Sequence, residues 1–241
     1  MFLLSTIFAF LLAVVLTPVF RNLAVKTNLC DNPRDDVLKI HKKPIPLIGG
    51  IGMLLATLIA LGVMPIFVKI NHWQLLGILT SGLLAAGIGL WDDLRWKNKS
   101  QDYKPKVKFI LQVLISSLIG IILFLVKIQI QFISIATFGI LLGILYIFGA
   151  MNAINMQDGI DGLAGGLVAI SALGFGLWAH FTGNVWGVLL SLSLLGSVMG
   201  FLIYNFPPAS IFMGDSGSHF LGFTLATLAI LFTSKPYNLS R

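Results

Sequence analysis

About eight long apolar runs, separated by short polar segments, dominate the sequence. A transmembrane helix needs roughly 20 consecutive apolar residues, so most of these runs are long enough to cross a bilayer. They are Phe2–Phe20, Ile45–Val68, Trp73–Trp91, Phe109–Val126, Ile130–Ala150, Leu163–Phe181, Val185–Tyr204 and Phe220–Thr233. The pattern predicts an all-α, polytopic integral membrane protein that forms a single transmembrane domain over residues 1–241.

The composition excludes the usual soluble classes. Hydrophobic residues make up 57% of the chain and charged residues only 10%, whereas a soluble domain carries about 25% charged residues. The single cysteine, Cys30, has no second cysteine to pair with, which excludes a disulfide-stapled secreted fold. The first run is longer than the core of a signal peptide and has no basic segment before it, so we expect a retained helix. The basic residues lie between the apolar runs, which favours membrane orientation over nucleic-acid binding.

The polar loops differ in charge, which assigns them to the two sides of the membrane. Segments 21–43 and 95–108 are rich in Lys and Arg and lie on the same side by parity. The positive-inside rule predicts that this side is cytoplasmic and that the N-terminus is outside. The same parity places all nine acidic residues on the cytoplasmic side: Asp31, Asp35, Asp36, Asp92, Asp93, Asp102, Asp158, Asp161 and Asp215. We therefore expect one acidic site where several helices end.

The first candidate group is the carboxylate pair Asp92-Asp93, which follows an apolar run. Two adjacent carboxylates near a region of low dielectric need a cation to neutralise them, so the pair can hold a divalent metal or supply a base. A helix terminus with two solvated charges explains this pair equally well when it is taken alone.

The second candidate group lies in the segment Asn152–Gly162. Asn152, Asn155 and Asp158 recur at a spacing of three residues, which puts them on one face of a helix. Asp161 follows between glycines. Amides and carboxylates at a membrane boundary are costly to bury unless a polar ligand meets them, so we interpret the segment as a binding site. Turn and capping chemistry accounts for Asp158 but hardly for the whole set.

The third candidate is Asp215, which Gly214 and Gly217 bracket. An Asp-Ser turn that caps the last helix is the alternative interpretation. The loops offer no set of His and Cys ligands, so the available metal ligands are oxygens. Oxygen ligands suit Mg²⁺ or Mn²⁺ better than zinc. We assign no catalytic role to a histidine.

Together these loops resemble those of the polyprenyl-phosphate N-acetylhexosamine-1-phosphate transferases. This bacterial membrane family, of glycosyltransferase 4 type, also includes the phospho-muramoyl-pentapeptide transferases. The matching segments are His41-Lys42-Lys43-Pro44-Ile45-Pro46-Leu47-Ile48-Gly49-Gly50, Asp92-Asp93, Lys104-Pro105-Lys106-Val107-Lys108, Asn152–Gly162 and Phe212-Met213-Gly214-Asp215-Ser216-Gly217-Ser218. The stretch Pro-Ile-Pro-Leu-Ile-Gly-Gly looks more like the undecaprenyl-phosphate GlcNAc-1-phosphate transferase branch.

The resemblance implies an activity, a cofactor and partners. Members of the family transfer a sugar 1-phosphate from a UDP-sugar, here most specifically UDP-GlcNAc, to undecaprenyl phosphate and release UMP. The reaction needs Mg²⁺, for which Mn²⁺ is a substitute. It is the first membrane step of a cell-surface glycan such as the O-antigen of lipopolysaccharide. The implied location is the bacterial inner membrane, with the lipid bilayer as a partner, no nucleic acid, and a homodimer left open.

The resemblance also implies roles for single residues. Asp215 and Asp93 would hold the metal, and Asp92 and Asp93 would position or deprotonate the lipid phosphate. Asp158 and Asp161 would take part in catalysis on the nucleotide-sugar side or at the metal. The substrate-binding set is Asn152, Asn155, Lys106, Lys108 and His41. Lys106 and Lys108 serve equally well as positive-inside anchors.

The sequence departs from the family pattern in two places. Members usually have ten or eleven spans and a histidine-rich cytoplasmic loop after the last helix seen here, whereas this sequence ends at Arg241. Leu111 also stands where a glycine often precedes Gln112. We therefore expect either a fragment or a shortened member with altered sugar recognition. A secondary transporter is an alternative, although its site would lie near the midplane. A non-catalytic homologue that binds polyprenyl phosphate is another.

Overall fold

The computed structural model describes residues 2–33, 43–97, 105–130 and 135–233. Over these residues it contains eight α-helices that are long and apolar enough to cross a membrane. The helices are α1 (Phe2–Lys26), α2 (Gly49–Val63), α3 (His72–Lys97), α4 (Pro105–Leu125), α5 (Ala136–Gln157), α6 (Leu163–Thr182), α7 (Val185–Asn205) and α8 (Gly214–Thr233). A 3₁₀ turn, η1 (Met64–Ile66), extends α2, and two short strands, β1 (Cys30–Asp31) and β2 (Ile45–Pro46), pair antiparallel. The prediction of an all-α polytopic membrane protein is confirmed.

Several predicted helix boundaries differ from the structure by four residues or more, and three of these differences have a clear local reason. Ile45 does not begin a helix, because Pro44 and Pro46 favour extended backbone and the segment pairs with β1 instead. Helix α3 continues through Asp92 and beyond, so the aspartate pair lies inside its last turns rather than after it. Helix α8 begins at Gly214, well before the apolar run, so the polar segment of the third candidate site is helical.

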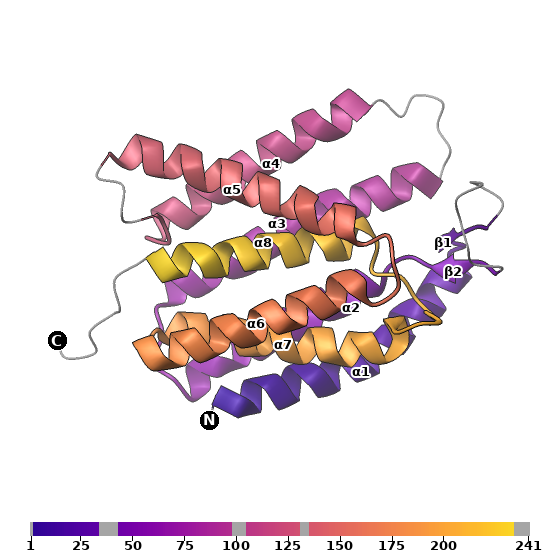
Figure 1. Cartoon of the computed structure of the whole chain (residues 1–241), viewed down its shortest axis with the longest axis horizontal. Helices are drawn as coiled ribbons and strands as arrows, with labels where there is room; N and C mark the ends of the chain where they lie inside the picture. Colours follow the sequence, from indigo (N-terminus) through magenta and orange to yellow (C-terminus); the bar gives the residue numbers. More distant parts are fainter. Residues whose placement is uncertain (1, 34–42, 98–104, 131–134, 234–241) are drawn as a thin grey trace.

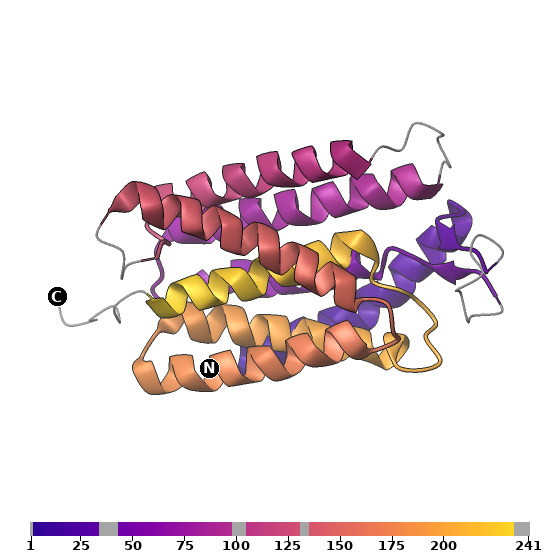
Figure 2. The ribbon, with the colours of Figure 1, turned by 45° about the horizontal axis from the view of Figure 1, so that its top comes forward.

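Helix α8 lies at the centre of the bundle (Figure 1). It packs against α2, α3, α5, α6 and α7, and most of its residues are buried. Helix α1 packs on α2 and α7, and helix α4 packs on α3 and α5 at the periphery. The turned view in Figure 2 shows α4 beside α3 and away from α1. The fold therefore builds its core around the helix that carries Asp215.

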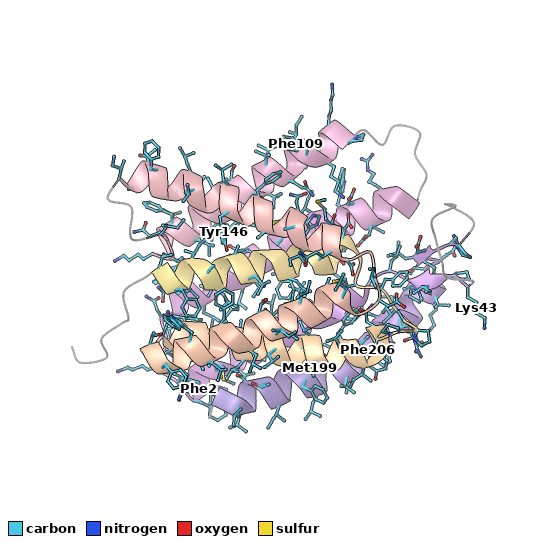
Figure 3. The ribbon with its side chains drawn as sticks, in the orientation of Figure 1. Phe2, Lys43, Phe109, Tyr146, Met199 and Phe206 are labelled. Carbon is cyan, nitrogen blue, oxygen red and sulfur yellow. The ribbon has the colours of Figure 1, made fainter. Side chains whose placement is uncertain are left out.

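The connections that carry the candidate residues all lie at one end of the bundle. The loop between α5 and α6, the loop between α7 and α8, and strands β1 and β2 are together at the right in Figures 1 and 2. In Figure 3, Lys43 and Phe206 lie toward this end and Phe2 toward the other. At the opposite end, Gly183 (φ 70°) and Asn184 join α6 to α7 in a tight turn, in which the Asn184 side chain accepts a hydrogen bond from the Gly187 N–H. The parity argument thus predicted correctly which loops share a side.

Glycines let the backbones around the start of α8 approach one another. Gly50 of α2 lies directly against the backbone of Gly217, and Gly89 of α3 lies against the carbonyl group of Asp215. At both positions a side chain would collide with backbone, which cannot move aside as the end of a flexible side chain can. Close backbone approach through small residues is a common way to pack helices in membranes.

Replacing Gly89 by alanine should therefore destabilise the protein. The added methyl group would overlap the Asp215 carbonyl oxygen, and overpacking of this kind costs about 1–3 kcal/mol. Gly87→Ala, two residues away on the same helix, is the matched control because its methyl group meets no atom within 4 Å. Thermal unfolding in detergent measures both variants. Equal melting temperatures for the two would contradict the packing described here.

Candidate active site

Four helices bring polar side chains together at the predicted cytoplasmic end of the bundle. Helix α3 contributes Asp92 and Asp93 near its C-terminus, α4 contributes Lys108 from its first turn, α5 contributes Asn155, and α8 contributes Asp215. Asp92 and Asp93 are 4% and 6% exposed. The expectation that separate loops would converge on one site therefore agrees with the geometry.

Asp215 is the centre of this group. Its Oδ1 atom accepts a hydrogen bond from the Asn155 side chain at 2.7 Å, and its Oδ2 atom accepts one from Lys108 Nζ at 2.8 Å. Lys108 is also ion-paired with Asp92. Asn155 further contacts Ser218 Oγ at 2.9 Å. One ammonium group thus bridges two carboxylates from different helices. The space between Asp92 and Asp215 therefore favours a positively charged group.

Asp93 has a different position from its neighbour Asp92. Its Oδ1 atom accepts a hydrogen bond from the Asp215 backbone N–H at 2.9 Å, and its Oδ2 atom accepts one from the Ser216 N–H at 3.2 Å. The first N–H groups of a helix have no partner inside the helix, and a negative charge near them is favourable. Asp93 therefore caps α8 from another helix. It determines where the chain turns into α8, with Gly214 at φ 71° just before the cap.

Asp158 directly follows the last residue of α5. Burial raises the pKa of the Asp158 carboxyl group well above its ordinary value, and the nearby carboxylates of Asp215, Asp93 and Asp161 raise it further. Burial and like charges both oppose ionisation of a carboxyl group. The surroundings of Asp158 therefore disfavour its negative charge.

Asp161 and Asn205 tie two loops together. Asp161 Oδ2 accepts a hydrogen bond from the Ala209 N–H at 2.9 Å. Asn205 Oδ1 accepts one from the Gly162 N–H at 3.1 Å, and its Nδ2 donates to the Ile211 carbonyl at 3.0 Å. The segment between α5 and α6 is therefore fastened to the segment between α7 and α8.

The Pro-Ile-Pro-Leu-Ile-Gly-Gly stretch fastens the other side of the same loop. The Phe212 N–H donates to the Pro46 carbonyl at 2.8 Å, while the N–H groups of Gly49 and Gly50 donate to the carbonyls of Phe212 and Met213, each at 2.9 Å. The motif thus holds the chain that leads into α8 by backbone hydrogen bonds.

Other predicted residues lie outside the central group. Asn152 donates to the Phe148 carbonyl of its own helix at 2.9 Å, and Lys106 is exposed. His41 falls outside the described residues. Within the described ranges, no group of three or more His, Cys, Asp or Glu side chains could hold a metal ion. The metal roles predicted for Asp215 and Asp93 therefore stay predictions.

Comparison with known proteins identifies the family. The model of glycosyl transferase family 4 matches residues 75–233, which include most of α3, all of α4 to α8 and the whole central group. The chain belongs to glycosyl transferase family 4.

Named relatives of this family 4 chain fall into two kinds. It is 31% identical to the probable undecaprenyl-phosphate N-acetylglucosaminyl 1-phosphate transferase of Bacillus subtilis (strain 168), over 97% of this chain and 63% of that protein. It is 34% identical to the phospho-N-acetylmuramoyl-pentapeptide-transferase of Thermoanaerobacter sp. (strain X514), over 95% of this chain and 74% of that protein. The corresponding Aquifex aeolicus (strain VF5) protein is also 34% identical, over 96% and 72%. The chain thus spans about two thirds to three quarters of the length of these relatives.

Sequence reasoning missed one polar contact in this family 4 chain. Gln112 and His219, on α4 and α8, are buried and lie 2.9 Å apart between their Nε2 atoms. The signal was present: Gln112 follows Lys108 by four residues, and His219 follows Asp215 by four. Only the knowledge that α4 side chains reach α8 makes that shared spacing informative.

Asp161→Ala should loosen the loop before α8. The Ala209 N–H would lose its carboxylate acceptor, a charge-assisted hydrogen bond worth about 1.5–3 kcal/mol. We expect faster hydrogen–deuterium exchange at residues 209–212, measured by mass spectrometry. Met156→Ala is the control, because Met156 is 85% exposed near the same loop. Unchanged exchange in Asp161→Ala would show that Asp161 does not anchor the loop.

Asp158→Asn should stabilise the protein, and more so at higher pH. Because the folded state raises the pKa of Asp158, ionisation of this carboxyl group costs folding free energy as the pH rises through the folded value. Asparagine cannot ionise. The gain in melting temperature should therefore grow with pH and vanish below about pH 4, the ordinary aspartate pKa, where Asp158 is protonated in both states. A gain that is independent of pH would contradict this electrostatic origin.

Proposed function

We propose that the chain carries the active site of a transferase that moves an N-acetylhexosamine 1-phosphate group from a UDP-sugar to undecaprenyl phosphate. The observation that carries this proposal is the bridge of Lys108 between Asp92 and Asp215, at the buried start of α8. A reaction between two phosphate-bearing substrates needs positive charge where those phosphates meet, held by groups that do not themselves react. Membership of glycosyl transferase family 4 supports the same reaction class.

The most specific donor we propose is UDP-GlcNAc. The Bacillus subtilis relative named above is a probable N-acetylglucosaminyl 1-phosphate transferase, and the Pro-Ile-Pro-Leu-Ile-Gly-Gly stretch resembles that branch. The product would enter cell-surface glycan synthesis at the bacterial inner membrane.

The surroundings of Lys108 support a lipid acceptor. The next two residues of α4, Phe109 and Ile110, are 56% and 55% exposed on an otherwise apolar helix face. Figure 3 shows Phe109 on the outer side of the bundle. An isoprenoid chain lying along this face can bring its phosphate to the Lys108 ammonium group without leaving the hydrocarbon region.

The donor set fits Mg²⁺, with Mn²⁺ as a substitute. Magnesium is usually bound by one or two carboxylates together with substrate phosphates and water, so a cage of three protein ligands is not required. Asp215 and Asp92 would hold the ion together. Their two carboxylates already share one positive group, the ammonium group of Lys108. Asp93 was predicted as a ligand, but both its oxygens accept backbone hydrogen bonds, so we propose that it acts by positioning Asp215. When bound, the metal ion neutralises the negative charge that builds up on the diphosphate.

The chain's own groups would then divide the remaining work. An oxygen of the lipid phosphate forms a bond to the phosphorus that carries the sugar, and the bond from that phosphorus to the oxygen of UMP breaks. UMP leaves with the bonding electron pair. Lys108 attracts the incoming lipid phosphate, Asp92 orients it or takes its remaining proton, and Asn155 fixes the orientation of the Asp215 carboxylate. Positive charge that arrives with the donor would favour the ionised form of Asp158.

The proposal predicts Mg²⁺-dependent release of UMP. The detergent-purified chain is incubated with undecaprenyl phosphate and a panel of UDP-N-acetylhexosamines, and UMP and the lipid product are quantified by chromatography. We expect release with UDP-GlcNAc and loss of release on chelation. Release of UMP without lipid product would exclude the transferase. Saturable binding of undecaprenyl phosphate with no UMP from any donor would favour the non-catalytic homologue.

Asp215→Asn tests the role of the central carboxylate in the same assay. The amide keeps the size of the side chain but loses its charge, so turnover should fall at least about a hundredfold. Asp31→Asn, in strand β1, is the matched control for loss of one negative charge. Retained activity in Asp215→Asn would remove the metal role from this residue.

A further inference from the structure

Helix α4 reaches α8 by side chains that pass between two other helices. Helices α4 and α8 both pack on α3 and on α5, which lie between them. Two contacts nevertheless join α4 to α8 directly: Lys108 to Asp215 and Gln112 to His219. Each pair lies one helical turn from the other on both helices, because four residues separate the members on α4 and on α8. The two contacts therefore form two rungs between the same two helices. We call Lys108–Asp215 the upper rung and Gln112–His219 the lower rung.

The lower rung is the more enclosed of the two. Gln112 is 3% exposed and His219 is fully buried, whereas the Lys108 side chain is 25% exposed. The Nε2 atoms of the Gln112 amide and the His219 ring lie 2.9 Å apart, within hydrogen-bond distance. A buried hydrogen bond of this kind favours a narrow range of distances and angles.

The outer face of α4 cannot set the rotation of the helix. The exposed residues Phe109, Ile110 and Leu114 are apolar and form no hydrogen bond through their side chains, although the Phe109 ring makes an edge-to-face contact with Phe148. One residue corresponds to about 100° of rotation, so a modest turn of α4 would carry Lys108 away from Asp92 and Asp215. The inner face carries the partly exposed Lys108 and the buried polar residues Gln112 and Ser116, besides buried apolar residues nearer the other end of the helix. Ser116 makes only a weak contact with Met151 Sδ at 3.8 Å.

We propose that Gln112 and His219 are positioning residues that hold α4 in the rotation at which Lys108 bridges Asp92 and Asp215. Neither residue needs to touch substrate for this role. The consequence for catalysis rests on the proposed function, whereas the consequence for the position of Lys108 does not. The proposal explains why a buried amide and a buried imidazole are retained in a helix pair that could otherwise be joined by apolar side chains.

The test uses Lys106 as an internal reference for Lys108. Lys106 is exposed on the same helix two residues earlier, so an amine-reactive acetylating reagent should label it in every variant. The ratio of labelled Lys108 to labelled Lys106, read by tandem mass spectrometry, reports how well Lys108 is held between its carboxylates. We expect Gln112→Leu and His219→Leu each to raise this ratio about tenfold, since a lost hydrogen bond of this kind changes an equilibrium by about that factor.

Two further variants separate positioning from general loosening. Thr224→Val removes a buried hydroxyl of α8 that bonds to the Phe220 carbonyl of its own helix at 2.8 Å, and it should leave the ratio unchanged. The exchanged pair Gln112→His with His219→Gln should restore the wild-type ratio. Both side chains carry their Nε2 atom three bonds beyond Cβ, so the exchange keeps the reach of the rung.

The outcomes are distinct for the two proposals. An unchanged ratio in both leucine variants, an equal rise in Thr224→Val, or a raised ratio in the exchanged pair would each overturn the positioning role. Turnover measured on the same samples should fall in the leucine variants and recover in the exchanged pair. If no sample releases UMP while the labelling ratios change as expected, the proposed function fails and the positioning role stands.

Discussion

The structure depends on how the backbone N–H groups at the buried start of helix α8 find hydrogen-bond acceptors. A helix that begins inside a bundle exposes N–H groups with no partners in its own first turn. Asp93 accepts two of these groups from α3, and the glycines at positions 50 and 89 bring the neighbouring backbones close enough to enclose the turn. The direction of Asp215 follows from this arrangement, and Lys108 and Asn155 can then reach its two oxygens. The candidate site is in this sense a consequence of helix capping.

The clustered aspartates do not share one role. Asp92 and Asp215 face a common cation, Asp93 accepts backbone hydrogen bonds at the start of a helix, and Asp161 anchors a loop. The surroundings of Asp158 oppose its charge. A sequence shows five carboxylates at helix ends, but it does not show which oxygen atoms are already engaged by backbone groups. That difference decides which carboxylates remain open to a metal or a substrate.

The sequence predicted the parts that depend on local pattern and on parity. Apolar runs of sufficient length predicted the eight helices, and the alternation of loops predicted that the aspartates would gather at one end. It could not predict the hydrogen bond from the Ala209 N–H to Asp161, which lies 48 residues earlier. Every residue except proline has a backbone N–H, so no residue type in the sequence indicates which one a distant carboxylate will bind. The sequence also failed at Ile45 and Gly214, where tertiary contacts override hydropathy. Ile45 pairs in a strand, and the polar segment at Gly214 begins a helix that Asp93 caps.

The different roles of Asp158 and Asp161 have a consequence for how mutational data on such a site are interpreted. Asp158 and Asp161 are three residues apart, and an activity screen alone would not distinguish the loss of one from the loss of the other. Yet replacement of Asp161 should damage the fold of the loop, while replacement of Asp158 should relieve an electrostatic strain. Essential and catalytic are therefore separate properties here. Only a stability measurement made beside the activity measurement tells a residue that performs chemistry from one that holds the chain in place for it.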